Sequence, residues 1–166
     1  MRGYFAIGSE RISKAMNLGA LMRTANAFGA SFVFSIDARH QLQQAYAADT
    51  SKTAGAIPYY PYGSIDELQL PRGCQLVGVE LTDYAILLPT FLHPVRAAYI
   101  LGPERGNLSP DTVARCDHVV KIPTRFCINL SLAGALVMYD RHLAFGGYAP
   151  RPIMPGGVSG DGKDDG

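Results

Sequence analysis

Short runs of apolar residues alternate along this chain with stretches in which apolar residues recur every three or four positions. The short runs predict buried strands, and the helical spacing predicts helices with one apolar face. We expect five strands, at Gly3–Ile7, Ser31–Ile36, Gln75–Glu80, Arg96–Leu101 and His118–Ile122. Alternating strands and helices are typical of an α/β domain with a mostly parallel sheet flanked by helices.

The first predicted helix begins at Asn17, which is suited to cap a helix, and ends at Gly29. Its apolar face consists of Leu18, Leu21, Met22, Ala25 and Phe28. Ser109 and Pro110 have the chemistry of a cap and a first helical position, so a second helix is predicted to about Cys116.

The last predicted helix stops before Gly146. Five residues at helical spacing form its apolar face: Leu132, Ala135, Leu136, Tyr139 and Leu143.

The length of 166 residues, 48% of them apolar and 17% charged, fits one globular domain, which we place at residues 1–150. From Arg151 the composition shifts to Gly, Pro, Ser and Asp, so residues 151–166 are predicted to be a disordered tail. Gly157–Lys163 has the spacing of a phosphate-binding P-loop. We assign it no function, because Asp164 stands where the magnesium-binding Ser or Thr belongs.

Several classes of protein are excluded by what the sequence lacks. No apolar run approaches the roughly 18 residues of a membrane span, and the apolar segment near Met1 is too short for a signal peptide. We therefore expect a cytoplasmic protein without a membrane partner. Cys74, Cys116 and Cys127 are widely spaced and form no Cys-x-x-Cys pair, so neither disulfides nor a metal site is predicted.

The net charge of +1 hides an uneven distribution. Residues 1–48 carry five basic and two acidic side chains, residues 49–95 two and five, and residues 96–151 seven and four. The last fifteen residues carry one basic and three acidic side chains. Charge alone favours an ordinary solvated surface. Arg supplies 11 of the 15 basic residues, however, and its planar fork matches phosphate best.

Three segments place polar residues beside small ones where helices or turns begin: Asn17–Arg23 (NLGALMR), Gly102–Ser109 (GPERGNLS) and Ile122–Ser131 (IPTRFCINLS). Each alone has a plain structural explanation, namely an amphipathic helix with one exposed Arg, a strand-to-helix loop, and a capped helix start. The second segment lies where α/β sheets bind ligands, beyond the carboxyl end of a strand.

In order and detail the three segments resemble the motifs of the SpoU/TrmH family of SPOUT-superfamily RNA methyltransferases, in its minimal, TrmL-like form. The motifs are an Asn-x-Gly-x-x-x-Arg helix start, a Gly-x-Glu-x-x-Gly-type turn followed by Leu-Ser, and an Ile-Pro strand end followed by Ser-x-Asn-x-Ser and a helix of small residues. Cys127 replaces the first Ser of the last motif. The resemblance, which spans about Gly3 to Leu143, implies the SPOUT fold, whose C-terminal deep trefoil knot would comprise Gly102–Gly106 and Ile122–Ser131.

The resemblance also implies that the knot holds S-adenosylmethionine, largely through backbone groups. The implied cofactor-binding residues are Val79, Leu101, Gly102, Gly106, Ile122, Cys127 and Leu130. Arg23 takes the catalytic position, supported by Asn17 and Glu104, and Asn129 holds the loop or the substrate. Because guanidinium does not readily lose a proton, we expect Arg23 to grip RNA phosphate and stabilise a developing alkoxide.

The implied reaction is methylation of a ribose 2′-hydroxyl of RNA by a homodimer. The apolar faces of the helices after Asn17 and Ser131 are the expected interface, with Arg23 near it. We favour tRNA over rRNA as the substrate, because the chain has no appended RNA-binding domain. A catalytically silent SPOUT-like RNA-binding protein and a base-directed methyltransferase of the same superfamily stay open as alternatives.

Overall fold

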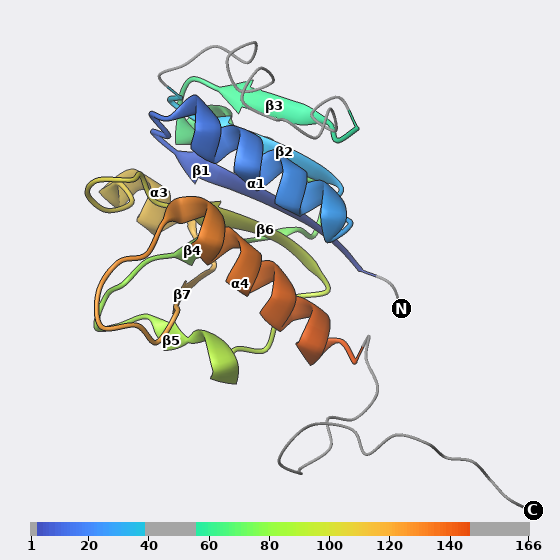
Figure 1. The fold of residues 1–166 in the computed structure, drawn as a ribbon, viewed down its shortest axis with the longest axis vertical. Helices are drawn as coiled ribbons and strands as arrows, with labels where there is room; N and C mark the ends of the chain where they lie inside the picture. Colours follow the sequence, from blue (N-terminus) through green and yellow to red (C-terminus); the bar gives the residue numbers. More distant parts are fainter. Residues whose placement is uncertain (1–2, 39–55, 147–166) are drawn as a thin grey trace, which may run out of the picture.

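In a computed structural model, the described residues, 3–38 and 56–146, form a seven-stranded sheet in the order β3-β2-β1-β6-β4-β7-β5 (Figure 1). All pairings between these strands are parallel. The elements are β1 (Tyr4–Glu10), α1 (Ala15–Ala27), β2 (Phe32–Ile36), β3 (Tyr59–Tyr62), η1 (Ile65–Glu67), β4 (Gln75–Val79), β5 (Ile86–Leu87), η2 (Leu88–Thr90), β6 (Arg96–Leu101), α3 (Pro110–Arg115), β7 (His118–Lys121) and α4 (Leu130–Ala144). The predicted α/β class with a mostly parallel sheet is confirmed. The expected domain end at residue 150 and the tail lie outside the described residues.

Alternate side chains of the central strands enter two separate apolar clusters. On β6, Tyr99 and Leu101 pack with residues of α1 and α4, which lie side by side across one face of the sheet (Figure 1). Ala98 and Ile100 pack on the opposite face, with Ile65 of η1 and with α3. Because both faces are covered, the central strands are continuous apolar runs, which is why the sequence predicts them well.

The five predicted strands are present, and β6 has the predicted bounds. Strand β1 runs three residues beyond Ile7, since Ser9 and Glu10 still pair with β2. Two edge strands were not predicted. Strand β3 contains Pro61, which is tolerated at a sheet edge but argues against a strand, and β5 has only two residues, both exposed.

The prediction that Asn17 caps the first helix is wrong. Helix α1 begins at Ala15, with Lys14 as its N-cap, and Asn17 is buried in the first turn. Its side chain is held by tertiary partners, which a local pattern does not reveal. The end of the helix is as predicted, because Gly29 follows the C-cap and adopts a left-handed φ of 74°.

Two other helices have side-chain caps, of which the cap at Ser109 was predicted. The Ser109 side chain accepts a hydrogen bond from the Thr112 amide at the start of α3. The Asn129 side chain accepts from the amides of Ser131 and Leu132 at the start of α4.

Helix α4 buries a different face from the one predicted. The residues that pack inward are Leu130, Ala133, Gly134, Val137, Met138 and Arg141. The predicted apolar residues Leu132, Leu136, Tyr139 and Leu143 are 40–61% exposed. The inner face packs closely against α1: a Cβ on Gly134 would lie 2.7 Å from Leu21 Cδ1. We call the exposed set Leu132, Leu136, Tyr139 and Leu143 the outer face of α4.

The predicted apolar face of α1 packs inward, with Leu18, Leu21, Met22 and Ala25 buried in the core. This face is therefore unavailable as a subunit interface, which corrects that part of the expectation.

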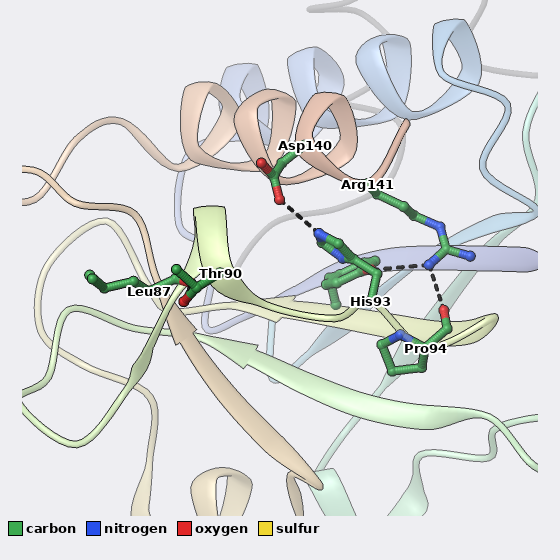
Figure 2. A network of polar contacts seen from close by, with 7 residues as sticks. Leu87, Thr90, His93, Pro94, Asp140 and Arg141 are labelled. Atoms are coloured by element: carbon green, nitrogen blue, oxygen red, sulfur yellow. Dashed lines mark hydrogen bonds and ion pairs between the residues drawn. The ribbon is translucent and has the colours of Figure 1, made fainter. Parts of the chain in front are cut away.

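A buried polar network fixes the second half of α4 to the sheet (Figure 2). The two ring nitrogens of His93 pair with the Tyr99 hydroxyl at 2.6 Å and the Asp140 carboxylate at 2.8 Å. The Arg141 guanidinium donates to the Pro94 carbonyl oxygen at 2.6 Å. Burial lowers the pKa of His93 below its usual value, against the opposing effect of Asp140. The network anchors α4 at its end remote from the loop that precedes it.

Candidate active site

A pocket of about 360 Å³ opens where β4, β6 and β7 end. Its walls come from the loops after these strands and from the beginnings of α1 and α4. Small-molecule sites have volumes in this range, and open α/β sheets place them at this edge. The two segments expected to form the knot, Gly102–Gly106 and Ile122–Ser131, both contribute to the pocket; the knot itself stays a prediction.

All seven residues predicted to bind the cofactor line this pocket: Val79, Leu101, Gly102, Gly106, Ile122, Cys127 and Leu130. Their roles stay predictions.

Three of the four residues predicted to be catalytic, Asn17, Glu104 and Asn129, also line the pocket, and Arg23 does not. Arg23 is exposed on α1, about 1.7 turns beyond Asn17. It makes no hydrogen bond or ion pair with another residue of the described ranges. The structure therefore brings together the three polar residues but leaves the cation apart from them.

The Glu104 carboxylate fastens the start of α1 to the turn after β6. It accepts hydrogen bonds from the backbone amides of Ser13 and Lys14, each at 3.0 Å, from the Ser13 hydroxyl, and from the Asn17 side chain. Burial acts to raise the pKa of Glu104, but these hydrogen bonds outweigh it and hold the pKa below its usual value. Glu104 is therefore ionised with its oxygens occupied, which suits a positioning residue and not a proton acceptor.

Asn129 connects the third segment to the other two. Its Oδ1 caps α4 and also accepts from the Ser131 hydroxyl at 2.6 Å. Its Nδ2 donates to Asn17 Oδ1 at 3.3 Å. Glu104, Asn17 and Asn129 thus form one chain of hydrogen bonds, which we call the Glu104 chain and which joins all three predicted segments.

Glu80, which lines the pocket and is buried, was not among the predicted site residues. Its two oxygens accept from the backbone amides of Leu108 at 2.7 Å and Leu81 at 3.0 Å. Burying a carboxylate costs free energy unless it accepts hydrogen bonds. An acidic residue directly after a buried apolar strand is therefore the sequence signal that could have identified Glu80.

Glu10, the last residue of β1, was also missed. Its buried carboxylate accepts from the Ser109 amide and the Thr112 hydroxyl, both at 2.7 Å. Glu10 and Glu80 together fix the end of the turn that begins at Gly102.

Glycine is required for the shape of this turn. A Cβ on Gly102 would lie 3.1 Å from the Glu80 carboxylate and 3.4 Å from the Leu108 amide nitrogen, and Gly106 adopts a φ of 96°. The turn therefore presents backbone groups, with few side chains, to the pocket.

The residues present fit S-adenosylmethionine. Leu101, Ile122 and Ile128 provide apolar walls for an aromatic base, and the carboxylates of Glu80 and Glu104 favour a sulfonium cation nearby. Backbone groups of the turn at Gly102 are available for a ribose.

Two kinds of feature, a metal-binding cluster and a membrane-spanning helix, are absent from residues 3–38 and 56–146. These residues contain no group of three or more His, Cys, Asp or Glu side chains that could hold a metal ion. Within the same ranges, no helix has the length and apolar character needed to span a membrane.

Comparison with known proteins identifies relatives along most of the chain. A family model described as the SpoU rRNA Methylase family matches residues 4–139. A protein of Archaeoglobus fulgidus named as an uncharacterized tRNA/rRNA methyltransferase is 29% identical over 82% of this chain and 63% of its own length. The tRNA (guanosine(18)-2'-O)-methyltransferase of Escherichia coli K12 is 23% identical over 79% of this chain and 59% of its own length.

A solved structure supports the same fold. The AdoMet-bound rRNA methyltransferase of Sinorhizobium meliloti superposes with a TM-score of 0.75 and 21% identity, over 86% of this chain and 57% of that one. This chain thus spans less than two thirds of the length of each of these proteins.

Proposed function

Because this chain belongs to the SpoU rRNA Methylase family, we propose that it is an RNA methyltransferase that uses S-adenosylmethionine to methylate a ribose 2′-hydroxyl. The Glu104 chain is the observation that carries the proposal, since it joins the three motif segments around one pocket. A catalytically silent relative would share this pocket, so a measurement of methyl transfer separates the two functions.

The residues of this protein have two tasks in the reaction. When bound, S-adenosylmethionine supplies an electrophilic methyl group. The apolar side chains of Leu101 and Ile122 exclude water from this methyl group. The Glu104 chain of hydrogen bonds holds the three motif segments in a fixed arrangement. The 2′-hydroxyl oxygen must approach the methyl carbon in line at roughly 3–3.5 Å, so such positioning is the main contribution of the protein. Methyl transfer would form the O–C bond as the sulfonium S–C bond breaks, and the hydroxyl proton would pass to solvent.

The position of Arg23 outside the pocket supports a homodimer as the active form. A second copy can bring its own Arg23 to the mouth of the pocket, where the cation would hold RNA phosphate and stabilise the developing alkoxide. The outer face of α4 is the interface we propose. Leu132, Leu136 and Tyr139 expose apolar surface there, next to the helix that carries Arg23.

We propose tRNA as the substrate and the cytoplasm as the place of action, with rRNA as the second candidate. The tRNA assignment rests on the similarity to the Escherichia coli enzyme, and the rRNA alternative on the similarity to the Sinorhizobium meliloti one.

Transfer of tritium from labelled S-adenosylmethionine to separate tRNA and rRNA fractions tests the proposal, with calorimetric titration of the cofactor as a companion. We expect cofactor binding and label in tRNA. Label only in rRNA would select the second substrate. Cofactor binding with no label in either RNA would contradict the proposed activity and favour the silent alternative.

A further inference from the structure

Phe126 is an exposed aromatic residue in a loop that lines the pocket. It lies in the loop between β7 and α4, is 74% exposed, and is the most exposed of the seven phenylalanines. Its neighbours Thr124, Cys127 and Ile128 line the pocket. Within the described ranges the ring makes no aromatic or cation–π contact, so it is free to accept a flat partner.

Basic residues are found near the same pocket. Arg125 is exposed next to Phe126. A second hollow of about 340 Å³ adjoins the pocket, with which it shares Lys14 and Glu104, and Arg11 and Arg105 add two guanidinium groups to it.

Three cations, Arg11, Lys14 and Arg105, line the hollow with one carboxylate, Glu104, so positive charge is in excess. The Glu104 oxygens accept hydrogen bonds from the start of α1. Arg11 donates to the Asn107 carbonyl oxygen at 2.8 Å, while its buried Nε has no partner among the described residues. The hollow is therefore a positive site suited to phosphate.

On the basis of the proposed RNA methyltransferase function, we propose that Phe126 is the platform on which a nucleobase of the bound RNA stacks, beside phosphates held by Lys14 and Arg105. A ribose that reaches the pocket belongs to a nucleotide drawn out of its own stack. Single-stranded RNA is recognised in this way, with bases on aromatic rings and phosphates on cations, and the aromatic face replaces the stacking that the base has lost.

Binding to two probes separates stacking from charge. The probes are a fluorescein-labelled oligoadenylate and an abasic oligoribonucleotide of equal length, both followed by fluorescence anisotropy. Phe126→Leu keeps an apolar side chain but removes the aromatic face. We expect it to weaken oligoadenylate binding by about fivefold or more and to leave abasic binding unchanged. Phe126→Tyr should restore oligoadenylate binding.

Tyr60→Leu is the matched control, because Tyr60 is an exposed aromatic residue on β3, at the opposite edge of the sheet from β7. It should alter neither affinity. Equal affinities of wild type and Phe126→Leu for oligoadenylate would overturn the inference. So would a Phe126→Leu protein that changes its oligomeric state, since the ring would then be covered by a second copy.

The anisotropy assay does not depend on methyl transfer. A wild-type protein that transfers no methyl group refutes the proposed function, whereas equal oligoadenylate binding by wild type and Phe126→Leu refutes only the role of Phe126.

Discussion

The side-chain amide of Asn17 donates a 3.0 Å hydrogen bond to the carboxylate of Glu104, 87 positions farther along the chain. Asn17 also accepts a hydrogen bond from Asn129. A helix start, a strand-to-helix turn and a pocket loop are therefore held in one arrangement, and a change in any one of the three residues should disturb the other two segments.

Glu104→Gln should destabilise the fold and weaken cofactor binding. An amide in place of the carboxylate presents an N–H group to donors at Ser13 or Lys14, so hydrogen bonds to the start of α1 are lost. We expect the free energy of unfolding to fall by about 1–3 kcal/mol in urea titrations, with a higher Kd for S-adenosylmethionine by calorimetry.

Asp66→Asn is the control, because Asp66 is exposed on η1, away from the pocket. If Glu104→Gln and Asp66→Asn both match wild type in unfolding and binding, the Glu104 chain does not organise the pocket.

Arg23→Lys should abolish most turnover without unfolding the protein. Lys keeps the positive charge but lacks the planar fork that can hold phosphate and a developing alkoxide together. We expect kcat to fall by on the order of 100-fold, with RNA binding largely retained. Stability should change by no more than about 0.5 kcal/mol, since Arg23 is exposed.

The control for this variant is Arg72→Lys. Arg72 is exposed just before β4 begins, at the amino ends of the strands and so at the end of the sheet opposite the pocket. Near-normal kcat in Arg23→Lys would rule out the proposed role of Arg23.

Stability should depend on pH through His93. Burial places the pKa of the folded His93 below its usual value of about 6.5, so the unfolded chain binds a proton that the fold does not. The contribution of His93 is thus fully present above pH of about 6.5. It declines as the pH falls from there toward the folded pKa, by at most about 1.4 kcal/mol per pH unit.

Urea titrations of wild type and His93→Gln at several pH values measure this dependence. The variant should lose the part of the pH slope that His93 contributes, whatever its absolute stability. An unchanged slope would mean that His93 does not carry the effect.

Leu136→Asp should convert the proposed dimer into a folded monomer. Leu136 is 44% exposed on the outer face of α4, so the charge is tolerated in a single chain but not in an apolar interface. Sedimentation velocity should show a dimer for wild type and for Tyr60→Asp, and a monomer for Leu136→Asp. A monomeric wild type would refute the interface.

Cys127→Ser should retain activity and cofactor affinity. Cys127 is exposed at the pocket, and methyl transfer to a hydroxyl needs no covalent enzyme intermediate. A hydroxyl also makes stronger hydrogen bonds than a thiol. Loss of activity in a steady-state methylation assay would show that the thiol has a role that this account lacks.

The strands and caps that could be predicted from the sequence are those decided by local chemistry. Strand β6 is an apolar run buried on both faces. Ser109 caps helix α3, which begins at the next residue. Asn17 could not be placed correctly, because Glu104 and Asn129, far along the chain, decide its role. The buried face of α4 was missed because its apolar residues lie on both sides.

The residues of the pocket came from resemblance to a family, since no spacing rule brings Val79 and Ile122 to one wall. The roles of Glu10 and Glu80 could not be predicted in this way. A carboxylate at the end of a buried strand can be assigned a role only when the backbone amides that donate to it are known.

Mass spectrometry of nucleosides tests the central claim most directly. RNA fractions are incubated with S-adenosylmethionine carrying a deuterated methyl group and either wild type or Arg23→Lys, then digested to nucleosides. We expect a deuterated 2′-O-methylnucleoside from tRNA with wild type and little of it with Arg23→Lys. A deuterated methyl group on a base, or none in any RNA fraction, would contradict the proposed reaction.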